Sequence, residues 1–128
     1  MKILGIGVDI VTNKRIKNLI NNQSFIKRTF GNKEINFAKK VSNKVNYYAK
    51  RFAAKEAFAK SLGTGFRNNL NFKDIEILND KMGKPFYFKT KKIEQTIKKK
   101  FNIKKFNLFL SISDEKDYSI AFTILESK

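Results

Sequence analysis

Two carboxylates stand in apolar stretches of the chain, where a charged side chain needs a partner. Asp9 lies in the strand-like run 3–11, and Glu56 lies in a helical run of mostly Ala, Phe and Lys. Helical spacing puts Phe52, Glu56 and Ala59 on one stripe, so Glu56 faces the same way as apolar neighbours. Desolvating a carboxylate is costly unless a cation neutralises it. The two acids therefore predict a shared divalent cation of the oxygen-binding kind, for which Mg²⁺ is the leading candidate.

A cation and a glycine turn follow Glu56 and suit a phosphate-bearing ligand. Lys60 comes one helical turn later, and Gly63 and Gly65 stand where the helix is expected to end. Structural alternatives exist for both acids. Glu56 can pair with a neighbouring Lys or Arg on a half-exposed face, and Asp9 can cap a turn. The residue types and their spacing leave these alternatives open.

The composition indicates an anionic partner. The 128 residues include 28 Lys or Arg and 11 Asp or Glu, which gives a formal net charge of +17. Such a surplus is typical of proteins that bind nucleic acid, an anionic membrane surface, an acidic protein or a polyphosphate, although the abundance of Lys, Asn, Ile and Phe also fits drift in an A+T-rich genome. The absence of Cys and His excludes disulfides, thiol catalysis and imidazole bases. Any metal is therefore expected to bind to oxygen ligands.

The hydrophobic pattern predicts a single α+β domain over residues 1–128, with a mixed or antiparallel sheet packed on a long central helix. Gly63 is expected to end the long helix, and Thr90 is expected to cap the last one. No apolar stretch has the length of a membrane span and no signal-peptide pattern opens the chain, so we expect a cytoplasmic protein without membrane insertion. The predicted elements are a central strand over 2–11, helices over 13–20, 24–30, 32–38 and 43–63, strands over 72–79 and 85–88, a helix over 90–101, and hairpin strands over 106–113 and 118–124.

Three motifs carry a family resemblance across essentially the whole chain. The first is GIGVDIV at 5–11 followed by Arg15, the second is RFAAKEAFAKSLGTG at 51–65, and the third is SIS at 111–113 followed by YSIA at 118–121. In this order and spacing they resemble the motifs of the holo-[acyl-carrier-protein] synthases, the small single-domain 4′-phosphopantetheinyl transferases. The second motif is specific, and the combination of the three is stronger than any one of them.

The resemblance implies an enzyme of fatty acid biosynthesis that moves the 4′-phosphopantetheine arm of coenzyme A to a serine of apo-acyl carrier protein, releasing adenosine 3′,5′-bisphosphate. It implies that Asp9 and Glu56 hold Mg²⁺ and that Lys60 adds positive charge against the phosphates, which makes these three the catalytic residues. It also implies a homotrimer with active sites between subunits. The acceptor of the serine proton stays open, and a water near Glu56 is one option. The implied coenzyme A contacts are Arg51, as a candidate for the 3′-phosphate, Lys60, Gly63, Gly65, Gly83, Lys84, Pro85, Ser113 and Asp114.

The basic side of the predicted helix 13–20 has two interpretations. A solvated face is the usual place for Lys and Arg. In the family this helix meets the acidic carrier protein, and Arg15 matches the family's arginine there, so the resemblance implies docking by Arg15 with help from Lys14 and Lys17. Asp114 departs from the family, which usually carries His at this position. Because a carboxylate repels a polyphosphate unless it is paired, the family's role for that residue is not carried over.

Two rival functions belong to other classes. A basic nucleic-acid-binding domain fits the net charge, but the chain has no recognised aromatic and basic signature such as that of an RNA recognition motif. A structural basic subunit of a larger assembly also fits the charge. The resemblance favours the transferase, which therefore predicts no nucleic-acid partner.

Overall fold

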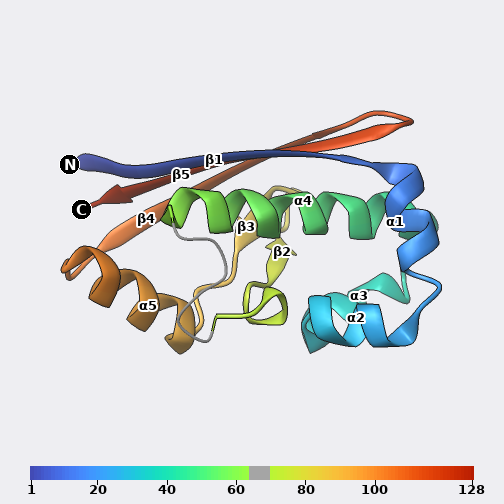
Figure 1. Cartoon of the computed structure of the whole chain (residues 1–128), viewed down its shortest axis with the longest axis horizontal. Helices are drawn as coiled ribbons and strands as arrows, with labels where there is room; N and C mark the ends of the chain where they lie inside the picture. Colours follow the sequence, from blue (N-terminus) through green and yellow to red (C-terminus); the bar gives the residue numbers. More distant parts are fainter. Residues whose placement is uncertain (64–69) are drawn as a thin grey trace.

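The computed structural model describes residues 1–63 and 70–128 and confirms the α+β class (Figure 1). The large sheet has the strand order β1–β5–β4, with both neighbouring pairs antiparallel, and a separate antiparallel hairpin pairs β2 with β3. The strands are β1 (Lys2–Thr12), β2 (Ile77–Asn79), β3 (Pro85–Tyr87), β4 (Phe106–Asp114) and β5 (Tyr118–Ser127). The helices are α1 (Asn13–Leu19), α2 (Gln23–Thr29), α3 (Asn32–Ala38), α4 (Lys44–Leu62) and α5 (Lys91–Phe101), with a 3₁₀ turn, η1 (Phe72–Asp74).

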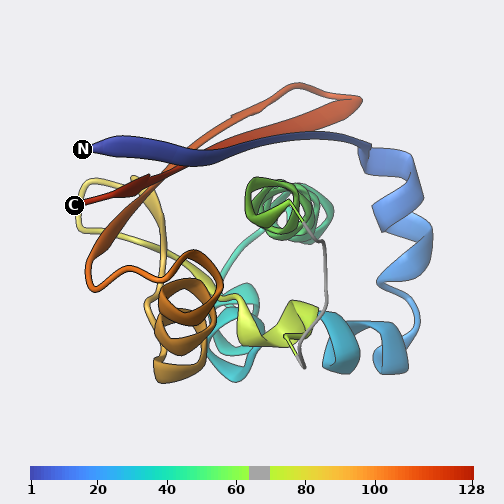
Figure 2. The same ribbon diagram turned by 60° about the vertical axis from the view of Figure 1, so that its left-hand side comes forward.

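Helix α4 runs through the middle of the molecule. The large sheet covers one side of it, the short helices α2 and α3 lie on the other side, and the β2–β3 hairpin lies beside it, with β3 in contact with β4 (Figures 1 and 2). Thirteen of its 19 residues are buried, as expected for a helix that is apolar nearly all round. Asn43 caps its start by accepting a hydrogen bond from the Asn46 amide, and Gly63 ends it with a φ of +79°. Both ends agree with the sequence prediction.

Gly5 and Gly7 let the β1 backbone approach α4 more closely than any side chain would allow. A Cβ added at Gly7 would lie 1.8 Å from the carbonyl oxygen of Ala57, and one added at Gly5 would lie 1.8 Å from that of Ser61. Both obstacles are backbone atoms of a helix, so they cannot move aside as a side chain would. This contact fixes the distance between the strand that carries Asp9 and the helix that carries Glu56.

Gly7→Ala is expected to destabilise the fold by about 1–3 kcal/mol or more, because overpacking must push the strand and the helix apart. Urea denaturation followed by circular dichroism measures this loss. The control is Gly83→Ala, since that glycine has open space around it and only its positive φ of +86° opposes a side chain, at a cost of roughly 1 kcal/mol. Equal losses in the two variants would contradict the close approach.

The prediction of a central strand over 2–11 is wrong, because β1 lies at one edge of the sheet and β5 is the central strand. The continuous apolar run suggested burial on both faces, but only the face toward α4 is covered. On the outer face Ile6, Val8 and Ile10 are 59%, 54% and 59% exposed. The apolar run of β1 is therefore left uncovered on one side within a single chain.

The prediction of one strand over 72–79 is also wrong. Residues 72–74 form the 3₁₀ turn η1, and only Ile77–Asn79 pairs as a strand. The Asp74 carboxylate accepts a hydrogen bond from the Asn71 amide, and such local side-chain bonding favours a turn over a strand. In addition, α2 begins before the predicted bound of 24, because the Asn22 side chain caps it by accepting from the Ser24 and Phe25 amides.

Candidate active site

Asp9 points from β1 toward α4. Side chains alternate along a strand, so Asp9 lies on the same face as Gly5 and Gly7, which contact the helix. The Lys60 ammonium group donates hydrogen bonds to the Asp9 carboxylate at 3.2 Å and to the Val8 carbonyl oxygen at 2.9 Å. The Asp9 side chain is 17% exposed and that of Lys60 is 54% exposed, so this ion pair lies at the edge of the solvent.

Glu56 lies one helical turn before Lys60 and is only half-buried. Burial raises the pKa of its carboxyl, and the negative charge of Asp9 raises it further, while Lys60 and Arg15 act in the opposite direction. Lys60, which pairs with Asp9, lies four residues after Glu56 on the same face of α4, so the two acids lie on either side of one ammonium group although 46 residues lie between them in the chain, from 10 to 55. The structure thus brings together Asp9, Glu56, Lys60 and Arg15.

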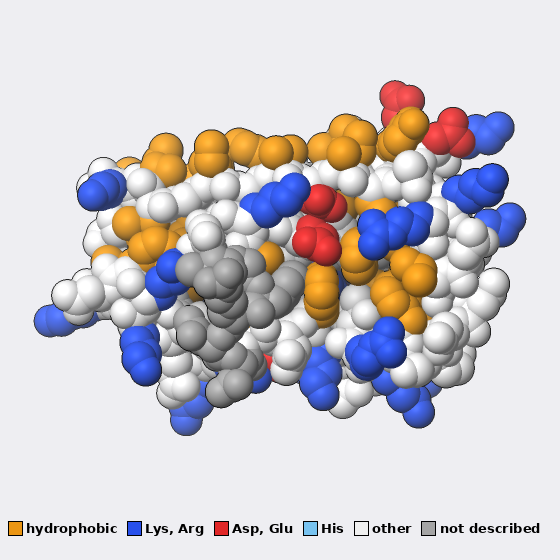
Figure 3. Space-filling view, in the orientation of Figure 1, with side chains coloured by type: hydrophobic (Ala, Val, Ile, Leu, Met, Phe, Trp, Pro, Cys, Tyr) orange, Lys and Arg blue, Asp and Glu red, His pale blue; other side chains and the backbone are white. Residues whose placement is uncertain are grey.

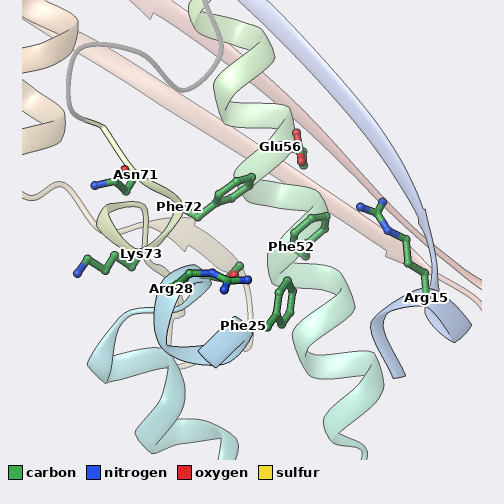
Figure 4. Close-up of a pocket in the computed structure, with 9 residues that line it drawn as sticks. Arg15, Phe25, Arg28, Phe52, Glu56, Asn71, Phe72 and Lys73 are labelled. Atoms are coloured by element: carbon green, nitrogen blue, oxygen red, sulfur yellow. The ribbon is translucent and has the colours of Figure 1, made fainter. Parts of the chain in front are cut away.

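A pocket of about 670 Å³ opens beside Glu56 (Figure 4). Three aromatic rings come from different elements: Phe25 from α2, Phe52 from α4 and Phe72 from η1, with Phe52 and Phe72 stacked at 5.6 Å between centroids. Its cations sit at the rim. The pocket can therefore hold a ligand with an apolar portion and an anionic end. The full lining is Arg15, Phe25, Arg28, Thr29, Phe52, Glu56, Asn71, Phe72 and Lys73.

The oxygen donors at this site suit a hard cation that takes only some of its ligands from the protein. Among the described residues no group of three or more acidic, His or Cys side chains gathers anywhere, so a cage built by the protein alone is not found there. Two carboxylates with oxygen donors match Mg²⁺, which commonly takes its remaining ligands from substrate phosphates and water. A cation between them would also relieve the repulsion that raises the pKa of Glu56.

The implied coenzyme A residues do not all gather at this place within one chain. Gly63 ends α4, and Gly65 lies outside the described residues. Gly83, Lys84 and Pro85 belong to the β2–β3 hairpin, whose strand β3 lies beside β4 and not beside β1. The hairpin turn has Gly83 at a φ of +86°, which favours glycine there.

Ser113 and Asp114 form a third, separate group at the end of β4. Ser113 pairs with Ile120 of β5, which in turn pairs with Ile10, so Ser113 lies two strands away from β1. The Asp114 carboxylate accepts a hydrogen bond of 2.6 Å from the side-chain amide of Asn46 at the start of α4. The Asp114 carboxylate is therefore paired with a neutral donor. Because β5 lies between β4 and β1, Asp114 and Asp9 are on strands that are not neighbours.

Arg51 is not presented to solvent, unlike the other implied phosphate ligands. Arg51 is only 4% exposed, and its guanidinium group donates a hydrogen bond to the side-chain oxygen of Asn79. Its guanidinium carbon lies 3.8 Å from the centroid of the Tyr47 ring. The expected contact with the 3′-phosphate of the coenzyme remains a prediction, and the geometry within one chain does not place Arg51 at the pocket.

The predicted docking residues lie on α1, next to the pocket. Arg15 lines the pocket and its guanidinium carbon lies 5.5 Å from the centroid of the Phe52 ring. Lys14 and Lys17 are exposed, and Lys14 lines a neighbouring hollow with Arg15 and Tyr118. The helix therefore presents its positive charges beside the carboxylates.

The sequence did not predict the pocket residues Arg28 and Lys73, nor the ion pair between Lys55 and Glu34. Arg28 and Lys73 gave no signal, because basic residues are spread along the whole chain. Lys55, which stood next to Glu56 in the same apolar run, is fully buried and donates to the carboxylate of Glu34 at 2.7 Å. The burial of Lys55 was detectable from its apolar neighbours, but its partner was not.

Comparison with known proteins shows the family of the chain. The model of the 4′-phosphopantetheinyl transferase superfamily matches residues 5–123. The chain belongs to this superfamily. Within it, the chain is 62% identical over 128 residues to the holo-[acyl-carrier-protein] synthase of Pelagibacter ubique, with 100% of both sequences covered. The match includes the motifs that carry Asp9 and Glu56.

Solved structures of the superfamily share this fold. The holo-[acyl-carrier-protein] synthase of Neisseria meningitidis superposes with a TM-score of 0.86 at 41% identity, covering 98% of this chain and 99% of its own. The synthase of Bacillus anthracis, solved in complex with CoA (3′,5′-ADP), superposes with a TM-score of 0.83 at 34% identity and full coverage of both chains. Within residues 1–63 and 70–128, this superfamily member has no helix with the length and hydropathy needed to cross a membrane.

Proposed function

We propose that this chain, in the cytoplasm, transfers the 4′-phosphopantetheine arm of coenzyme A to a serine of an acidic apo-acyl carrier protein and releases adenosine 3′,5′-bisphosphate. The observation that carries the proposal is the meeting of Asp9 and Glu56 beside Lys60, at the mouth of an aromatic pocket, in a chain with the superfamily's motifs. The reaction breaks a pyrophosphate bond while the serine oxygen attacks phosphorus. Such a transfer needs positive charge aimed at the phosphoryl oxygens.

Each group of residues at the site has its own role in this transfer. Asp9 and Glu56 would hold Mg²⁺, which, when bound, neutralises charge on the diphosphate. Lys60 is held in place by Val8 and Asp9 and directs its remaining N–H donor to solvent, where a phosphate oxygen can accept it. The rings of Phe25, Phe52 and Phe72 provide apolar surface for the pantetheine arm.

The test of the activity is incubation of the purified chain with coenzyme A, MgCl₂ and apo-acyl carrier protein, followed by mass spectrometry of the carrier protein. The expected result is a mass gain of one phosphopantetheine group on the carrier. An unmodified carrier protein, together with tight and salt-resistant binding of RNA or DNA in a filter assay, would favour the nucleic-acid-binding alternative instead.

Arg15→Glu is expected to raise the KM for the carrier protein by about tenfold or more, because charge complementarity governs the encounter of two oppositely charged proteins. The kcat should change less, since Arg15 touches the rim of the site. Lys99→Glu, on the last turn of α5, makes the same charge change away from α1 and serves as the control. Equal effects of the two variants would show that only net charge matters.

The uncovered outer face of the large sheet supports assembly of the chain into a homotrimer. Exposed apolar side chains follow one another across the strands, since Val8 pairs with Phe122 and Ile10 pairs with Ile120. Figure 3 shows hydrophobic side chains along the edge of the molecule above the sheet. Contiguous apolar surface of this kind marks an interface between proteins. A site completed by a second subunit would also bring separate groups, such as Ser113 and Gly83, to one coenzyme.

Phe122→Asp is expected to convert the assembly to single chains, because it places a charge in the middle of the apolar outer face, where Phe122 is 41% exposed. Light scattering coupled to size exclusion measures the mass, which should fall from three times 14.9 kDa to 14.9 kDa. Phe37→Asp, at an exposed aromatic residue of α3 outside the large sheet, makes the same chemical change and is the control. A parent protein that elutes as a single chain would contradict the trimer.

A further inference from the structure

Arg51 is a buried cation that contacts Asn79 and Tyr47. It stands in the middle of α4 and is 4% exposed. One terminal nitrogen donates to the side-chain oxygen of Asn79, and the plane of the guanidinium lies against the Tyr47 ring. Tyr47 is fixed in turn, because its hydroxyl donates to the backbone oxygen of Glu34 at 2.7 Å. A guanidinium in these surroundings is held rigidly and shielded from a ligand in solvent.

Asn79 passes this contact on to the hairpin turn. Its side-chain nitrogen donates to the backbone oxygen of Gly83 at 2.8 Å, while its side-chain oxygen accepts from Arg51. Asn79 ends β2 opposite Pro85, the first residue of β3. The side-chain amide of Asn79, the residue before the turn, thus joins Arg51 of α4 to Gly83 near the end of the turn that carries Lys84.

The turn is rigid within itself but needs an anchor to the rest of the molecule. The Asp80 carboxylate accepts from the amides of Met82 and Lys84, both at 2.9 Å. At the other end of the hairpin, the Tyr87 hydroxyl donates to the backbone oxygen of Ala54 at 2.7 Å. Arg51 and Ala54 lie one helical turn apart on α4. The two contacts together fix the orientation of the hairpin on the helix.

We infer that Arg51 is a positioning residue: through Asn79 it holds the 80–84 turn in place for the coenzyme and does not itself bind the 3′-phosphate. The inference rests on the proposed function, because it assigns the turn to the coenzyme. It replaces the expected direct contact between Arg51 and the 3′-phosphate by an indirect one. The unpaired Nε of Arg51, which has no hydrogen-bond partner in the described part of the chain, is buried and offers no open path to a phosphate.

The test compares two substrates, coenzyme A and 3′-dephospho-coenzyme A, in steady-state kinetics with the full-length protein. Asn79→Leu removes the anchor and leaves Arg51 in place, and Arg51→Met removes the cation. If Arg51 positions the turn, each variant raises the KM about tenfold to a hundredfold, the effect of losing one charge-assisted hydrogen bond. The factor should be the same for both substrates, and kcat should change little. The control is Asn36→Leu, an exposed Asn on α3.

A direct role for Arg51 predicts a different pattern and would overturn the inference. Arg51→Met would then raise the KM for coenzyme A and not for the dephospho form, and Asn79→Leu would have no effect. Hydrogen exchange of the Gly83 and Lys84 amides gives a readout independent of activity, and faster exchange is expected in Asn79→Leu. An unchanged thermal midpoint of this variant, expected because Asn79 is exposed, shows that its fold is intact. Unchanged exchange there would also overturn the inference. A parent protein inactive with both substrates would contradict the proposed function itself.

Discussion

Glu56→Gln lowers the rate of phosphopantetheine transfer by about 10²- to 10³-fold, the loss typical of removing one preorganised electrostatic contact to a transition state. The amide keeps the shape of the side chain but loses the negative charge that, with Asp9, would hold the cation. The rate is measured as the mass gain of apo-acyl carrier protein at saturating coenzyme A and MgCl₂. Glu94→Gln, on α5, removes the same charge from an exposed pair with Lys98 and should keep the parent rate.

The stability of Glu56→Gln separates a catalytic role from a structural one. Because the folded chain raises the pKa of Glu56, the contribution of this carboxyl to stability is complete in acid, below its unfolded pKa, and is lost as the pH rises through the raised value. Glu56→Gln should therefore unfold at a higher temperature than the parent at neutral pH, and the difference should vanish in acid. A variant that loses activity and also unfolds earlier at neutral pH would instead favour a structural ion pair.

Lys55→Met destabilises the fold by about 3–5 kcal/mol, the usual cost of breaking a buried ion pair by removing one partner. Both side chains of the pair are 0% exposed. The ammonium group of Lys55 also donates to the backbone oxygens of Phe72 and Ile75, so the variant leaves three acceptors without this donor. Burial lowers the pKa of Lys55 and raises that of Glu34, and each partner's charge opposes this effect.

Chemical denaturation measures the free energy of unfolding of Lys55→Met. The matched control is Lys98→Met, which breaks the exposed pair between Lys98 and Glu94, at 4.0 Å, and should cost about 0.3–0.5 kcal/mol. The two variants make the same chemical change, so the difference between them reports burial. If they lose stability equally, the pair between α3 and α4 contributes no more than a surface pair does.

The long helix and the position of Glu56 could be predicted because their signals are local. A run rich in Ala and Phe without Pro, ended by Gly63, predicts a helix over 43–63, and α4 follows it. Within that run, the register alone puts Glu56 beside Phe52 on one wall of the pocket. Gly5 and Gly7 are a local signal too, because residues without side chains leave room for another backbone, and α4 occupies that room.

The partners of the other charged residues could not be predicted from the sequence. Lys55 and Glu34 meet because α3 packs against α4, and 20 residues of chain lie between them. Arg51 matched a family motif, but its hydrogen bond to Asn79 depends on where the β2–β3 hairpin lies on α4. Contacts of this kind depend on tertiary packing, which no spacing rule encodes.

The edge position of β1 was missed for a related reason. An apolar strand indicates burial on both faces, but the pattern does not say whether the same chain or another one covers each face. Here β5 pairs with β1 on one side only, and Ile6, Val8 and Ile10 stay exposed. The strand pattern is explained if further copies of the chain cover that face.

The central claim is that Asp9 and Glu56 together bind one divalent cation. The most direct test is titration of the chain with Mn²⁺, a paramagnetic substitute for Mg²⁺, in the presence of coenzyme A, with free Mn²⁺ measured by electron paramagnetic resonance. The parent should bind one ion per site, in competition with Mg²⁺, and both Asp9→Asn and Glu56→Gln should lose this binding. Binding of Mn²⁺ by both variants with the affinity of the parent would contradict the claim.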